Sequence, residues 1–116
     1  MTLRVFGISN CDTVRRARAF LVQRSIAHEF HDFKQQGLAP QHVDTWIAAL
    51  GWERLLNRQG TTWRRLDEPV REGVVDAASA REVMLASPSV IKRPVVEWPD
   101  GAMSVGFDPR QWADRL

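Results

Sequence analysis

The chain has 116 residues, 44% of them hydrophobic, and a formal net charge of +2. This length predicts one compact domain, and no apolar run approaches the roughly 20 residues that a transmembrane helix needs. The N-terminus lacks the basic-then-apolar layout of a signal peptide, and a single cysteine excludes an internal disulfide framework. We therefore expect a soluble, cytoplasmic protein without membrane contacts.

The basic residues are mostly arginine, with lysine only at Lys34 and Lys92. The planar guanidinium fork suits carboxylates and oxyanions, although genome base composition also exchanges lysine for arginine. Basic and acidic residues are interleaved along the sequence, whereas a nucleic-acid-binding stripe is clustered. We expect anion contacts and no direct nucleic-acid binding.

The first 35 residues predict a βαβ unit. An apolar run over Leu3–Ile8 indicates a strand, and an amphipathic stretch over Asp12–Arg24 indicates a helix whose buried face holds Val14, Ala17, Leu21 and Val22. Ser25 and Ile26 break this helix, and alternation over Ala27–Phe33 indicates a second strand. A helical crossover of this kind makes the two strands parallel.

The middle of the chain predicts helices. Pro40 starts a helix that Gly51 ends. A further helix spans Asp76–Ala86, with its inward face made of Ala77, Ala80, Val83 and Met84. Between them Trp52–Leu66 is short and irregular in pattern, which predicts a segment anchored to the core by its large apolar residues, Trp52, Leu55, Leu56, Trp63 and Leu66.

The last part of the chain predicts two strands and a helix. Ser87–Trp98 leads into a strand, a turn at Pro99 to Gly101 follows, and Met103–Phe107 supplies the paired strand. Asp108 and Pro109 then cap a short helix. A βαβ half and a ββα half around a mixed four-stranded sheet form the thioredoxin-like arrangement, an α/β fold.

Cys11 is the only cysteine, and it lies where the first strand gives way to a helix. At a helix N-terminus, unpaired backbone N–H groups and the positive end of the helix dipole favour an anion such as a thiolate. Its neighbours Asn10 and Asp12 are polar. We interpret Cys11 as a reactive, low-pKa cysteine; the alternative is a buried thiol that acts as a small hydrophobe.

Pro94 is the second informative position. An X-Pro bond is the one peptide bond whose cis form costs little, and a proline cannot donate to a sheet, so it belongs at a strand end beside a site. We predict a cis Arg93–Pro94 bond facing Cys11.

Other candidate sites are weaker. His28 and His31 lie three apart on a predicted strand, which puts them on opposite faces, and no Cys/His cluster has metal-ligand spacing. A Cys–His pair with His31 has no support in the sequence. The five tryptophans indicate core and loop anchors rather than a base-stacking platform. We expect no metal site.

Four segments, in order along the chain, match one known family: Phe6–Arg18, Phe30–Lys34, Leu55–Arg64 and Pro88–Val95. The chain resembles the arsenate reductase ArsC and Spx family, most closely its small YffB-like branch. The resemblance implies a single domain over residues 1–116, with a glutaredoxin-like core in two halves, 1–35 and 88–116, and a helical insertion over 38–87. It also implies glutathione-linked thiol chemistry.

In that family the catalytic cysteine attacks arsenate, glutathione attacks the thiol–arsenate adduct, and a glutaredoxin resolves the mixed disulfide. By this resemblance Cys11 is the nucleophile, and Arg58 and Arg93 lower its pKa and hold the oxyanion. Substrate or glutathione binding falls to these two arginines and to Asn10, Asp12, Thr13 and Pro94. Glutathione is then a co-substrate and glutaredoxin a partner, with no tightly bound cofactor. The alternative for Arg58 is a solvated surface arginine.

One departure from the family concerns the last strand. True arsenate reductases carry a third arginine there, whereas residues 103–107 hold no cation. Because losing one oxyanion donor removes a few kcal/mol of transition-state stabilisation, we expect inefficient arsenate reduction and another oxyanion or disulfide substrate.

The alternative function is regulatory. Spx-like proteins share this fold, bind RNA polymerase, and in several cases use a Cys-x-x-Cys pair as a redox switch. Val14 occupies the second cysteine position here, which excludes an internal switch and leaves a cysteine-independent polymerase contact as the alternative.

Overall fold

A computed structural model describes residues 2–116 of the chain. The chain divides into two compact units: the first runs through Gln36 and resumes over Arg93–Leu116, and the second is Gly37–Lys92. That the whole chain forms a single domain stays a prediction. Within residues 2–116, no helix has the length and apolar character that would let it cross a membrane.

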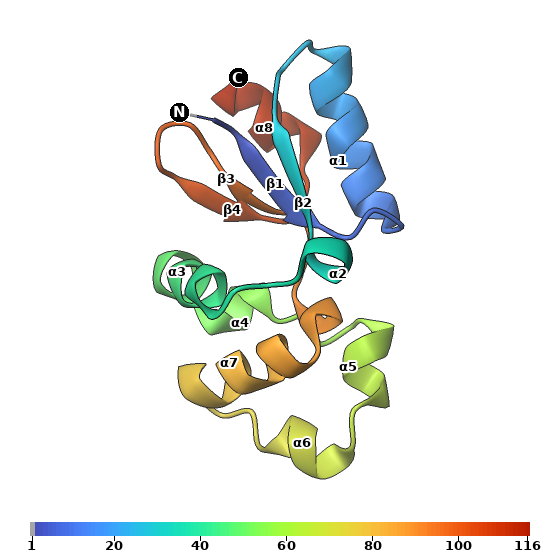
Figure 1. Cartoon of the computed structure of the whole chain (residues 1–116), viewed down its shortest axis with the longest axis vertical. Helices are drawn as coiled ribbons and strands as arrows, with labels where there is room; N and C mark the ends of the chain where they lie inside the picture. The colour runs from blue at the N-terminus through green and yellow to red at the C-terminus, as the bar shows by residue number, and fades with distance from the viewer. Residues whose placement is uncertain (1) are drawn as a thin grey trace. The chain divides into compact units, whose positions relative to one another are not determined.

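A mixed four-stranded sheet in the order β2-β1-β3-β4 forms the first unit (Figure 1). Strand β1 (Arg4–Gly7) pairs in parallel with β2 (Glu29–Asp32) and antiparallel with β3 (Val95–Glu97), which pairs antiparallel with β4 (Met103–Val105). This arrangement confirms the predicted thioredoxin-like sheet. Because β1 is an inner strand, the turn that follows Gly7 leaves the sheet between two neighbours.

Two helices cover one face of this sheet. Helix α1 (Asp12–Gln23) buries Ala17 and Leu21, and α8 (Pro109–Arg115) buries Trp112. These side chains join one cluster with residues in or next to β1 and β3, Leu3, Val5, Val96 and Trp98. The Trp98 and Trp112 rings meet edge to face, with centroids 5.2 Å apart. Apolar burial of this extent fixes the position of α1 on the sheet.

Local hydrogen bonding sets where several elements end. Strand β2 stops at Asp32 because its Oδ1 accepts the backbone N–H of Lys34 at 2.8 Å, which starts the short helix α2 (Phe33–Gln36). The predicted strand therefore ends one residue early, at the bond that begins α2. Likewise β4 ends at Val105, because Gly106 has φ +85°. Asp108 caps α8 by accepting the N–H groups of Arg110 and Gln111, as predicted.

The second unit is helical. Its elements are α3 (Pro40–Leu50), α4 (Trp52–Leu55), α5 (Thr61–Arg65), α6 (Glu68–Glu72), α7 (Ala77–Ala86) and the 3-10 helix η1 (Pro88–Val90). Asp76 and Ser79 form a capping box at the start of α7, and a salt bridge of 2.6 Å from Arg81 to Asp44 joins α7 to α3. The segment predicted to be irregular contains α4 and α5, and two of its expected anchors, Leu55 and Leu56, are buried.

Two predicted core positions are wrong. Val22 is 68% exposed, because it lies about 100° around α1 from its buried neighbour Leu21. Ala77, at the first position of α7, is exposed as well. The other predicted inward residues of α1, Val14, Ala17 and Leu21, are all fully buried.

Gly7 allows the close approach of α1 to β1. A Cβ atom at this position would lie 2.7 Å from Cγ2 of Val14, well inside van der Waals contact. Gly7→Ala should therefore reduce the free energy of unfolding by about 2 kcal/mol, as overpacking in a core does. Urea denaturation measures the change.

The matched control is the double-mutant cycle with Val14→Ala. Because the smaller side chain makes room for the new methyl group, Gly7→Ala should cost much less in the Val14→Ala background. Equal costs in both backgrounds would show that the contact with Val14 does not explain the glycine.

Candidate functional site

Cys11 is the N-cap residue of α1, with extended backbone angles φ −90° and ψ 127°. Its N–H donates to the Ile8 carbonyl at 3.1 Å, and its carbonyl accepts the Arg15 N–H at 3.0 Å. These two bonds close the turn that joins β1 to the helix. The thiol is thereby held at the helix N-terminus, where the sequence placed it, and the residue is neither fully buried nor fully exposed.

Opposing effects act on the ionisation of this thiol. Partial burial raises the pKa of Cys11, whereas the Val14 N–H, the Arg93 side chain and the Thr13 N–H lower it, and the net result lies below the ordinary thiol value. Within residues 2–116, Cys11 forms no side-chain capping bond of standard geometry. The two N–H groups therefore act on the sulfur mainly as the positive end of the helix.

Arg93 contributes both a hydrogen bond to the Cys11 sulfur and a favourable charge. It is half-buried and opens the second stretch of the first unit, directly before Pro94. The Arg93–Pro94 bond is cis, as predicted. The carbonyl of Pro94 accepts the Gly106 N–H at 2.9 Å, which ties this corner to the end of β4. Arg93 thus lies beside the thiol of Cys11, although the two residues are 82 positions apart in the sequence.

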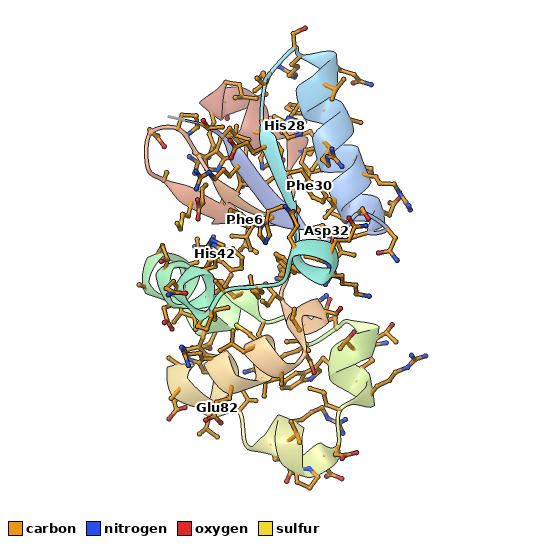
Figure 2. All side chains as sticks on the ribbon, in the orientation of Figure 1. Phe6, His28, Phe30, Asp32, His42 and Glu82 are labelled. Atoms are coloured by element: carbon orange, nitrogen blue, oxygen red, sulfur yellow. The ribbon has the colours of Figure 1, made fainter. Side chains whose placement is uncertain are left out.

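The turn before Cys11 is fixed by a buried carboxylate that the sequence analysis missed. Asp32 is 4% exposed, and its Oδ2 accepts the Ser9 N–H at 3.0 Å. Figure 2 labels it where β2 meets α2. Burial alone would raise the pKa of Asp32, but bonds from Ser9, Lys34 and Gln35 lower it below the usual range. An aspartate directly after an alternating strand is a helix-capping signal that could have marked it.

The structure brings together only some of the residues predicted for the site. Thr13 lies in the first turn of α1 beside the sulfur, and its N–H acts on the thiol. Asn10 and Asp12 flank Cys11 and are exposed. Pro94 is fully buried. Binding roles for these residues stay predictions.

Arg58 belongs to the second unit. It is exposed, and its guanidinium lies 5.4 Å from the centroid of the Trp52 ring. It lines a hollow of about 260 Å³ together with Glu53, Leu56, Asn57, Gln59 and Lys92. An antiparallel bridge between Leu56 and Ile91 holds the two sides of this hollow. A shared site for Arg58 and Cys11 stays a prediction.

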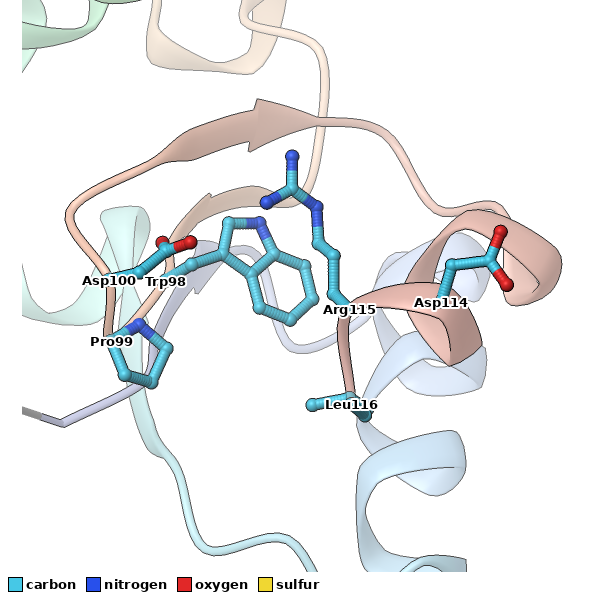
Figure 3. A pocket seen from close by; sticks show the side chains of 6 residues that line it. All are labelled: Trp98, Pro99, Asp100, Asp114, Arg115 and Leu116. Atoms are coloured by element: carbon cyan, nitrogen blue, oxygen red, sulfur yellow. The ribbon is translucent and has the colours of Figure 1, made fainter.

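A second hollow, of about 400 Å³, lies in the first unit between the β3–β4 turn and the end of α8 (Figure 3). Trp98 and Arg115 form its wall, with the guanidinium 5.0 Å from the indole centroid. Trp98 follows the residue that pairs with Arg4, whereas Cys11 follows the opposite end of β1. This hollow is therefore remote from the thiol.

Residues 2–116 contain no cluster of three or more histidine, cysteine or acidic side chains suited to a metal ion.

Comparison with known proteins identifies the family. A sequence model of the ArsC family matches residues 6–114. The chain belongs to the ArsC family. An uncharacterised protein of Haemophilus influenzae is 36% identical over 110 residues, which is 95% of each chain. The resemblance inferred from the sequence is confirmed.

Several solved structures share the fold. The YffB (PA3664) protein is 45% identical, with a TM-score of 0.93 over 99% of both chains. An arsenate reductase (ArsC) related protein from Brucella melitensis is 50% identical, with a TM-score of 0.78 over 98% of this chain and 93% of that one. An arsenate reductase from Vibrio cholerae, 18% identical, has a TM-score of 0.81 over 100% and 98% of the two chains. At that identity the likeness shows the fold alone.

The bonds of Asp32 predict a pH-dependent stability. Because its pKa is lowered in the folded protein, its contribution is complete above the ordinary value near 3.9 and is lost as the pH falls through the folded value. Asp32→Asn should reduce the free energy of unfolding by about 2 kcal/mol at pH 7, the order of a charged hydrogen bond.

Urea denaturation at pH 7 and at pH 3 measures this difference, which should shrink at the lower pH. Asp114→Asn, an exposed position on α8, is the control and should change stability by less than about 0.5 kcal/mol. An Asp32→Asn effect that is the same at both pH values would contradict a role for the ionised carboxylate.

Proposed function

We propose that this ArsC-family protein is a glutathione-dependent thiol reductase with Cys11 as its nucleophile. The observation that carries the proposal is the position of Cys11 at the N-terminus of α1, where the Val14 and Thr13 N–H groups and the Arg93 side chain lower the pKa of the thiol. A thiolate, and not a thiol, is the nucleophile in disulfide and oxyanion chemistry. Family membership and the 50% identical relative named as an arsenate reductase (ArsC) related protein support an oxidoreductase activity.

The reaction proceeds in two balanced exchanges when the substrate is a glutathione mixed disulfide. The Cys11 thiolate attacks the glutathione sulfur, a Cys11–glutathione disulfide forms, and the substrate leaves as a thiolate that takes up a proton. A second glutathione thiolate then attacks the glutathione sulfur of this intermediate. Oxidised glutathione is released and the Cys11 thiolate is restored, so the mixed disulfide and one free glutathione become the substrate thiol and oxidised glutathione. A glutaredoxin can take the place of the second glutathione.

Arg93 serves both steps. Its guanidinium favours Cys11 as the attacking thiolate, and it also favours Cys11 as the leaving group in the second exchange, because a low-pKa thiol leaves faster. Arg58 has a separate role, which is to hold a carboxylate of glutathione. Its guanidinium faces the Trp52 ring in a hollow that also holds Lys92, an arrangement suited to binding a carboxylate.

Arsenate should be a poor substrate. The arsenate reductases use a third arginine on the last strand, and the corresponding strand here is Met103–Val105. Two guanidinium groups then have to bind an oxyanion that three bind in those enzymes. A disulfide substrate develops less charge outside the sulfur atoms, so it needs only the thiolate and the groups that bind glutathione.

The proposal predicts turnover that depends on Cys11. With hydroxyethyl disulfide and glutathione, the wild-type protein should release oxidised glutathione, which glutathione reductase and NADPH report continuously. Cys11→Ser should abolish this activity and also the glutathione adduct seen by intact mass. Arg58→Gln should raise the KM for glutathione about tenfold, the loss of one charge-assisted contact.

Arg65→Gln is the matched control, because Arg65 is also an exposed arginine of the second unit. It should leave the KM unchanged. A Cys11→Ser protein that turns over as fast as the wild type would overturn the proposal, and a KM unaffected by Arg58→Gln would remove Arg58 from the site.

A further inference from the structure

Helix α1, which begins beside Cys11, holds more positive charge together with its C-cap Arg24 than the chain as a whole. Residues 12–24 contain four arginines and one aspartate, a net charge of +3, whereas the whole chain carries +2, so that the remaining residues carry −1. Within the first unit, the excess positive charge is therefore concentrated on α1 and its C-cap Arg24.

Two of these arginines lie where helix energetics disfavour them. Arg15 and Arg16 are exposed in the first turns of α1, near the positive end of the helix dipole, where a cation is unfavourable. Local rules of this kind are broken most often at functional positions. Arg93 is the one arginine whose charge acts appreciably on the thiol, so the charges on α1 need a different explanation.

These arginines are not neutralised within the part of the chain that the structure describes. The salt bridges of residues 2–116 join Arg4 to Glu29 and Glu97, and Arg81 to Asp44. Three arginines of α1 and its C-cap lie over aromatic rings instead, with guanidinium-to-centroid distances of 5.8, 4.1 and 4.4 Å for Arg16 over Phe107, Arg18 over Phe30 and Arg24 over Phe20. Stacking orients a guanidinium and leaves its charge available.

An apolar residue lies among these charges. Arg15, Ala19 and Val22 follow one another at helical spacing along the exposed face of α1. Val22 is 68% exposed, so this face combines exposed cations with an uncovered hydrophobic side chain. We call Arg15, Arg16, Ala19 and Val22 the α1 face.

We propose that the α1 face docks an acidic segment of a protein that presents a disulfide to Cys11. This inference rests on the proposed thiol reductase function and names the kind of substrate. Charge complementarity selects an acidic partner, and Arg15 to Val22 spans about 10 Å at the helical rise, which is longer than one small anion needs. Val22 favours a protein over a phosphate backbone, because protein interfaces combine arginine with apolar contacts.

Two matched peptides test this proposal. Each carries one cysteine as a mixed disulfide with 2-thiopyridine, flanked by three glutamates on either side in one peptide and by three serines in the other. The Cys11 thiolate attacks the peptide sulfur, the new Cys11–peptide disulfide forms, and the sulfur–sulfur bond to the pyridine breaks. The leaving group takes the electron pair and a proton as 2-thiopyridone, whose absorbance gives the rate. Intact mass confirms the site.

The readout is the ratio of the rate with the acidic peptide to the rate with the serine peptide. At low ionic strength, Arg15→Gln/Arg16→Gln should lower this ratio about tenfold relative to the wild type, the size of a modest steering effect. Intrinsic differences between the peptides cancel in that comparison. Val22→Glu should lower the ratio independently. Raising the salt to 1 M should make the ratios of all the proteins similar.

Arg110→Gln, an exposed arginine on α8 of the same unit, is the control and should leave the ratio unchanged. If the ratio is unchanged in both Arg15→Gln/Arg16→Gln and Val22→Glu, the docking proposal is overturned while the reductase function stands. A DNA duplex and a free glutamate peptide of equal charge can each be added as inhibitors of the reaction between Cys11 and the acidic peptide. Stronger inhibition by the DNA overturns the docking proposal in favour of a nucleic-acid partner. Failure of both peptides to label Cys11 overturns the thiol chemistry as well.

Discussion

The ionisation of Cys11 is decided by a competition between partial burial, which favours the neutral thiol, and the donors that surround the sulfur. Backbone N–H groups of Val14 and Thr13 and the guanidinium of Arg93 together outweigh the burial, so the pKa of Cys11 lies below the ordinary value. A fully buried thiol would have lost this competition, and a fully exposed one would gain little from the same donors, because water screens them. The chemistry proposed for the protein depends on this balance.

The rest of the first unit fixes the position of the Cys11 sulfur relative to these donors. β1 is an inner strand, so its end has neighbours on both sides. Gly7 lets the first turn of α1 lie close to the sheet, and Asp32 anchors the turn between them through the Ser9 N–H. The sulfur therefore meets the helix N-terminus in one geometry. Preorganised donors of this kind do not have to be reoriented when charge develops on the sulfur.

The thiol, the strand that precedes it, the helix that follows it and the cis Arg93–Pro94 bond are predictable from the sequence, because each has a local signature. The role of Asp32 is not, because its main partner at the turn lies 23 residues away in the chain. Val22 was predicted in the core, since a valine beside a buried leucine fits an apolar stripe until the helix is oriented on the sheet. The charge of α1 was visible in the sequence, but its lack of ion pairs within residues 2–116 required the structure.

The pH dependence of Cys11 alkylation by iodoacetamide tests the central claim most directly, measured on the wild type, Arg93→Gln and the control Arg110→Gln. The account predicts a half-maximal rate below the ordinary thiol pKa near 8.5 for the wild type and the control, and a higher value for Arg93→Gln. An ordinary pKa for the wild-type thiol, unchanged when Arg93 is replaced, would contradict the account.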